Sequence, residues 1–151
     1  MTTGDKTEGR LRVRPMEPED ITAVLAIDQS VSGVKRAITY TDLITGDLGG
    51  VLNLSVVAEL NGTVVGFILA RHALIGEPFY EVGFIHIIGV DPDQWRQGIA
   101  TKMVGFLLER CRAKGLKTVR IMLNEKDSQL QGLFSHLGFR RGNLIDYNKT
   151  L

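Results

Sequence analysis

The sequence is poor in the features that mark several protein classes. Cys111 is the single cysteine in 151 residues, which excludes an intrachain disulfide and suits a reducing compartment, so we expect a cytoplasmic protein. The net charge is only +1, which argues against nucleic-acid and membrane-surface binding. No apolar run reaches the length of a bilayer span. The polar start, MTTGDKTEGR, lacks the apolar core of a secretory signal.

The length predicts one domain, with residues 1–10 as a loose tail and residues 11–151 as the folded unit. A first strand is expected over Leu11–Met16. A helix is expected within Glu17–Gln29, because apolar residues recur there at helical spacing. A second helix is expected within Tyr40–Leu48, before a glycine pair.

The rest of the chain alternates strand and helix signals. Asn61-Gly62 stands between two β-rich runs and predicts a hairpin. Further strands are expected over Tyr80–Val90, 117–123 and 139–149, and further helices over 98–114 and 127–137. The order β-α-α-β-β-β-α-β-α-β predicts an α/β fold with a mixed sheet and helices on both faces, in which the strand–helix–strand unit from Tyr80 to Leu123 is parallel.

The stretch VDPDQWRQGIATKM, Val90–Met103, joins the buried strand to the long helix. A helix start offers free backbone N–H groups and partial positive charge, which favour a phosphate group. Gly98 and Ala100 are small enough to let an anion approach. No nucleotide-binding glycine fingerprint is present, so an ordinary loop-to-helix junction and a phosphate cradle both remain open at this point.

Three motifs occur together at a family-like spacing: Val90-Asp91-Pro92, Gly98-Ile99-Ala100, and the helix end FSHLGF at 134–139. From Val57 onward this pattern resembles the GNAT superfamily of acyl-CoA-dependent N-acetyltransferases. The resemblance implies a mixed central sheet and acetyl-CoA as the acyl-donor co-substrate. It also allows for a homodimer, because family members often dimerise.

By resemblance, backbone amides of the glycine loop hold the CoA pyrophosphate, and the pantetheine arm pairs with the strand before it. Trp95 stands where the family usually has Arg or Gln, and its ring either packs on the helix start or contacts the cofactor. Asp127 replaces a family Asn, and a helix N-cap is a sufficient alternative role for it. The implied cofactor-binding residues are Ile88, Gly89, Val90, Trp95, Arg96, Gln97, Gly98, Ile99, Ala100, Thr101, Asp127 and Phe134.

Transfer of acetyl to an amine needs a base, a polarised thioester carbonyl and a stabilised leaving thiolate. His86 is the first candidate base, since imidazole titrates near neutral pH, although a structural histidine would look the same. Glu81 is a second candidate, expected on the opposite face of the strand. Phe134 stands where the family often has a tyrosine acid. The thiolate then leaves without a side-chain acid, or water, Tyr147 or Tyr80 serves instead.

The sequence therefore predicts an N-acetyltransferase that transfers acetyl directly to a primary amine, with no bound metal. The alternative is a catalytically impaired acyl-CoA-binding module or sensor of the same fold. By resemblance, 30–43 should form one wall of the acceptor cleft, where Lys35, Arg36, Tyr40 and Asp42 are specificity candidates. The expected partners are acyl-CoA and an amine acceptor.

Overall fold

The turn at Asn61-Gly62 joins two strands, β2 (Val56–Leu60) and β3 (Thr63–Ile75). Both turn residues have positive φ, 52° at Asn61 and 86° at Gly62, as a two-residue hairpin turn requires. The predicted hairpin is confirmed. The structure is a computed structural model, which describes residues 10–33, 53–76 and 80–151.

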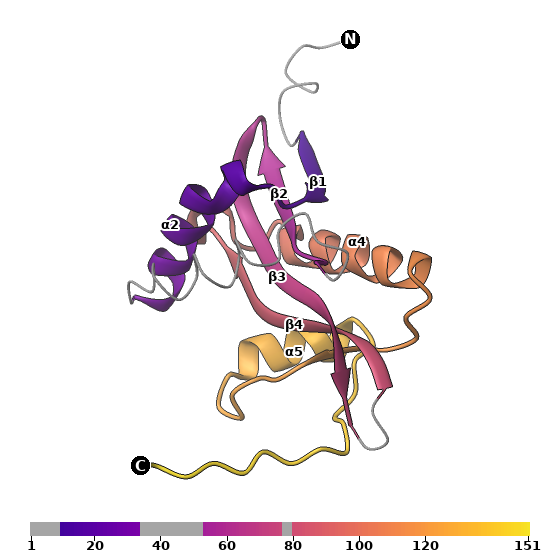
Figure 1. Cartoon of the computed structure of the whole chain (residues 1–151). Helices are drawn as coiled ribbons and strands as arrows, with labels where there is room; N and C mark the ends of the chain where they lie inside the picture. Colours follow the sequence, from indigo (N-terminus) through magenta and orange to yellow (C-terminus); the bar gives the residue numbers. More distant parts are fainter. Residues whose placement is uncertain (1–9, 34–52, 77–79) are drawn as a thin grey trace.

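Three further strands complete the sheet: β1 (Leu11–Pro15), β4 (Tyr80–Val90) and β5 (Val119–Ile121). The strand order is β1-β2-β3-β4-β5, and all neighbours are antiparallel except β4 and β5, which run parallel (Figure 1). The mixed sheet and the parallel strand–helix–strand unit are confirmed. β5 is shorter than the strand predicted over 117–123.

Helices lie on both faces of the sheet (Figure 1), as predicted. α2 (Ile21–Ser32) follows the short 3-10 turn η1 (Pro18–Asp20), and its Val24 and Ile27 bury a core with Phe67. α4 (Ile99–Ala113) and α5 (Ser128–His136) contribute to the core on the other face. The helix predicted over 40–48 and the tail over 1–9 lie outside the described residues.

A buried ion pair ties β1 to the start of α2. The guanidinium of Arg14 donates to both carboxylate oxygens of Asp20, at 2.8 and 2.9 Å, and to Glu59 at 3.1 Å. Asp20 also accepts the backbone N–H of Glu17 at 2.8 Å and is only 5% exposed. Burial alone would raise the pKa of Asp20, but the hydrogen bonds and charge of this cluster lower it below its usual value.

The strand predicted over 139–149 is wrong. Residues 139–151 form no strand, and Ile145 and Tyr147 are 81% and 90% exposed. Figure 1 shows this segment running away from the sheet to the C-terminus. Alternating apolar residues permit a strand, but a strand also needs a partner edge for its main-chain groups. In the described part of the chain, no strand pairs with this segment.

Candidate acyl-donor and acetyl-transfer site

β4 and β5 separate halfway along β4. Their pairing runs from Gly83↔Val119 to Ile85↔Ile121 and ends there. β4 continues to Val90, held on its other side by β3 as far as Gly66↔Val90. Beyond Ile85, therefore, β4 presents an edge that β5 does not cover, and Ile88, Gly89 and Val90 lie along it. Such an edge can accept another extended chain by main-chain hydrogen bonds.

His86 lies where the two strands part. Ala70 pairs with Ile85 and Leu69 with Ile87, so His86 is the extra residue of a β-bulge in β4. Its side chain is exposed, and its ring meets that of Phe84 edge-on with the centroids 4.9 Å apart. The bulge thus turns an imidazole toward solvent at the mouth of the gap.

Hydrogen bonds to the sheet fix both ends of the segment Asp91–Trp95, which follows β4. Asp91 donates its backbone N–H to Val65 O at 2.8 Å, and its carboxylate accepts the N–H of Asp93 at 3.0 Å. A short 3-10 turn, η2 (Pro92–Gln94), follows. The indole N–H of Trp95 then donates back to Val90 O at 2.7 Å. Trp95 is therefore bound to the end of β4, an arrangement that neither of its sequence-based interpretations included.

The glycine loop opens onto solvent at the start of α4. Arg96 and Gly98 both have left-handed backbone, with φ of 65° and 75°. The first main-chain bond of α4 runs from Lys102 N to Gly98 O, so the N–H groups of Ile99, Ala100 and Thr101 precede the helical ladder. Apart from Gly98 itself and its two chain neighbours, no atom of the described residues lies within 4 Å of where a Gly98 Cβ would stand. An anion can approach these N–H groups.

Three other predicted cofactor residues have structural roles. A Cβ on Gly89 would lie 2.7 Å from the Phe67 ring, so glycine is needed there for packing. Asp127 caps α5 by accepting the N–H of Leu130 at 3.0 Å. Phe134 is 2% exposed and packs edge-on against Phe139 in the core. Asp127 and Phe134 offer little to a cofactor as they stand.

The other candidate catalytic side chains do not gather around His86. Glu81 is paired with His72 at 3.3 Å and lies five residues away along β4, roughly 16 Å at strand spacing. Tyr80 begins the same strand, and Tyr147 is 90% exposed in the C-terminal segment. Of the three residues predicted as catalytic, only His86 lies at the strand gap. The cleft-wall candidates at 35, 36, 40 and 42 lie outside the described residues.

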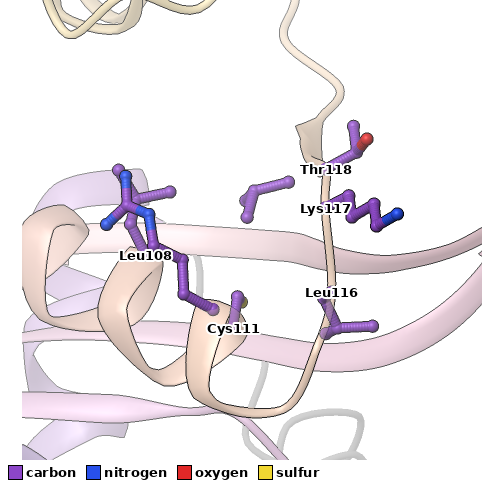
Figure 2. A pocket seen from close by; sticks show the side chains of 7 residues that line it. Leu108, Cys111, Leu116, Lys117 and Thr118 are labelled. Atoms are coloured by element: carbon purple, nitrogen blue, oxygen red, sulfur yellow. The ribbon is translucent and has the colours of Figure 1, made fainter.

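Cys111 lies far from the loop, near the C-terminal end of α4. Figure 2 shows it in a shallow pocket between that helix end and the chain entering β5, lined by Leu108, Cys111, Arg112, Leu116, Lys117, Thr118 and Val119. The thiol is 2% exposed, and burial raises its pKa. Cys111 is a small core residue rather than a nucleophile.

Sequence reasoning missed the bulge and the arginines beside it. A bulge is defined by pairing between two strands, so the sequence of β4 alone carries no sign of it. Alternation along the strand could have placed Phe84 and His86 on one face, but not Arg71 and Arg120 beside them, because that placement depends on register. Within residues 10–33, 53–76 and 80–151, no three metal-ligating side chains group to hold a metal ion.

No helix in the described ranges is long and apolar enough to cross a membrane. An acetyltransferase of Yersinia pestis (strain Pestoides F) is 28% identical over 99 residues, which make up 65% of this chain and 65% of that relative's length. The chain therefore spans about 65% of the length of the curated relative that it matches.

Two solved structures share the fold. The aminoglycoside N-acetyltransferase AAC(6')-Iy, in complex with a bisubstrate analogue, superposes with a TM-score of 0.81 at 18% identity, covering 95% of this chain and 100% of that one. The ribosomal-protein-S18-alanine N-acetyltransferase from Escherichia coli gives 0.73 at 19% identity, covering 88% and 79%. The acetyltransferase (GNAT) family matches residues 26–139, a span that contains the strand gap, the glycine loop and α5. The chain therefore belongs to the acetyltransferase (GNAT) family.

Proposed function

We propose that the protein is an N-acetyltransferase that moves acetyl from acetyl-CoA directly to a primary amine. The observation that carries this proposal is the uncovered edge of β4, which leads from His86 into the open N–H groups at the start of α4. An extended arm with a diphosphate at one end fits such an edge followed by a helix start.

In this arrangement the pantetheine arm lies along Ile88, Gly89 and Val90, and the pyrophosphate meets the loop amides. The Trp95 N–H already donates to Pro92 O at 3.3 Å, so the amides offered to the pyrophosphate extend from Arg96 through Gln97, Gly98, Ile99 and Ala100 to Thr101. Because these contacts are made by the main chain, most of the side chains can vary. Gly89 and Gly98 are the exceptions: a side chain at Gly89 would clash with the Phe67 ring, and Gly98 has a left-handed backbone whose side chain would project into the open space.

The chemistry then centres on His86. The neutral amine attacks the thioester carbonyl carbon, and a main-chain N–H of the strand gap stabilises the oxyanion. The new C–N bond forms, the C–S bond breaks, and CoA leaves as a thiolate. His86 accepts the proton that the nitrogen loses, directly or through water, and the thiolate takes up a proton from solvent. Tyr147 would serve as an acid only if its segment changed position.

Two measurements test the proposal. Calorimetric titration of CoA into the purified protein should give saturable binding. Incubation with acetyl-CoA and a panel of primary amines should release free thiol, and the release should fall steeply in His86→Ala. Absence of CoA binding at high concentration would refute the proposal.

The second candidate function is an acyl-CoA sensor that has lost catalysis. Phe134 and Asp127 favour it, because neither can supply what the family's tyrosine and asparagine supply, and the structure uses both in its own core and cap. Tight CoA binding without turnover of any amine would select the sensor.

We also propose that the protein works in the cytoplasm and forms a homodimer. The free, buried Cys111 suits a reducing compartment. The dimer is supported by the C-terminal arm, residues 143–151, which exposes Leu144, Ile145 and Tyr147. β5 is one of the two edge strands of the sheet, and in the proposed dimer the arm of one copy pairs with or covers the β5 edge of the other.

A further inference from the structure

One row of side chains crosses three neighbouring strands beside His86. Arg71 of β3 stands opposite Phe84 of β4, and Phe84 stands opposite Arg120 of β5. The row lies at the last but one paired level of β4 and β5, just before the gap opens. It places the main-chain positions of two arginines and a phenylalanine beside the entrance to the proposed transfer site.

These side chains share the sheet face opposite α4. Ala70, Ile85, Val119 and Ile121 contribute to the core that α4 covers. Their neighbours along each strand, Arg71, Phe84 and Arg120, must therefore point to the other face. The His86 ring contacts the Phe84 ring, so the imidazole stands on that face too.

One hydrogen-bond donor of Arg120 has no acceptor. Its Nε atom is buried and has no hydrogen-bond partner, and a buried N–H without a partner is energetically unfavourable. Its Nη1 lies against Gly142, where an added Cβ would be 3.2 Å away. In the described part of the chain, no carboxylate forms an ion pair with Arg120. Arg71 has interactions of its own, so the inference rests on Arg120.

The main-chain positions of Arg120 and His86 are close enough for the two side chains to reach one small acceptor. Adjacent strands lie about 4.8 Å apart, and His86 is two residues, about 6.6 Å, beyond the partner of Arg120. A guanidinium remains charged at any physiological pH and binds a carboxylate through two parallel hydrogen bonds.

We propose that Arg120 binds a carboxylate of the acceptor, so that the preferred substrates are amines that also carry an acid group, such as amino acids or peptides with a free C-terminus. This inference rests on the proposed transferase function and names the substrate class of the same site. Polycationic amines such as aminoglycosides should be poor acceptors, because their ammonium groups would meet a like charge.

The test compares matched acceptors that differ only in the acid group. Each of the twenty L-amino acids and its carboxamide is assayed by thiol release in the parent, in Arg120→Gln and in Arg112→Gln. Arg112 is the control, since it is exposed near the far end of α4 and pairs with Glu109. We expect Arg120→Gln to raise KM for the preferred carboxylate about 10- to 100-fold, with kcat within about threefold and the carboxamide reaction unchanged.

Equal losses for acid and amide in Arg120→Gln, or a parent that prefers carboxamides or kanamycin, would overturn the inference. Arg120→Lys keeps the charge and should recover part of the affinity, which a purely structural arginine would not require.

Carboxylate binding by Arg120 can also be tested without catalysis. If no amine is turned over, the transferase proposal fails, and calorimetry of the CoA-saturated protein with N-acetylated amino acids and their amides still tests Arg120. Binding of the acids that disappears in Arg120→Gln supports the inference. Absence of such binding in the parent contradicts it.

Discussion

The indole N–H of Trp95 and the carbonyl oxygen of Val90 are 2.7 Å apart. This bond closes the loop that leaves β4 and holds it against the strand end that precedes it. Arg96 and Gly98, which follow, adopt left-handed conformations next to the open edge. Trp95 thus positions the glycine loop, while the main chain would make the contacts to the diphosphate.

Replacing Trp95 with phenylalanine keeps the ring and removes the indole donor. One neutral hydrogen bond contributes about 1 kcal/mol, so we expect the Kd for CoA to rise about 3- to 10-fold. Isothermal calorimetry measures the Kd, and thermal melting checks that the fold is kept. An unchanged Kd would show that the loop holds its shape without this bond.

Gly98→Ala separates backbone strain from a role in anion binding. Gly98 and Gly62 both have positive φ, 75° and 86°, and open space around the missing Cβ. Alanine should therefore cost a similar amount of stability at either site, about 1 kcal/mol. CoA affinity should fall about tenfold or more in Gly98→Ala only. Equal CoA affinities in the two variants would argue against the loop as the diphosphate site.

Signals that are local in the chain predicted their parts of the fold well. Asn61-Gly62 specified its turn because both residues tolerate positive φ. Asp127 was recognised as an N-cap because the cap needs only its own helix. The junction between β4 and α4 was placed correctly for the same reason, since a helix start after a buried strand is visible in the residue order.

Features that depend on distant partners were not predictable. The bulge at His86 requires the register of β3 against β4. The prediction of a strand over 139–149 failed because apolar alternation shows a capacity to pair but not which partner the segment meets, and the segment does not pair with the edge strand β5. The Arg71–Phe84–Arg120 row likewise exists only once three strands are aligned. Tyr147, one of the alternative acids, lies within that predicted strand, so its expected position changes with it.

His86→Gln tests the proposed base and has a matched control. We expect kcat to fall about 10²- to 10³-fold while CoA affinity stays the same. The acid limb that a titrating imidazole gives to the pH–rate profile should also disappear. His72 is paired with Glu81 away from the strand gap, so His72→Gln should keep both activity and pH profile. A full pH dependence in His86→Gln would assign the base elsewhere.

Asp20→Asn should destabilise the fold in a pH-dependent way. The pKa of Asp20 is lower in the folded protein than the ordinary 3.8, so the ionised carboxylate stabilises the fold above that value, and this contribution is lost as pH falls through the folded pKa. Urea unfolding should show a loss of about 3 kcal/mol at pH 7 and a smaller difference from the parent below pH 4. Exposed Glu19→Gln should change stability by less than about 0.5 kcal/mol. A loss that is independent of pH would exclude the ion pair as its cause.

A charged substitution in the C-terminal arm should dissociate the proposed dimer. Ile145 is 81% exposed in the described chain, and burying it fully against a second copy would contribute about 1.5–3 kcal/mol per copy. Ile145→Asp should therefore shift the mass measured by light scattering from dimer toward monomer at micromolar concentration. Asn148→Asp adds the same charge to the same arm at a polar position and should leave the mass unchanged. Since a C2 dimer uses the contact twice, the effect of Ile145→Asp on the association free energy is doubled. A parent protein that is monomeric at every concentration would leave the exposed arm without this role.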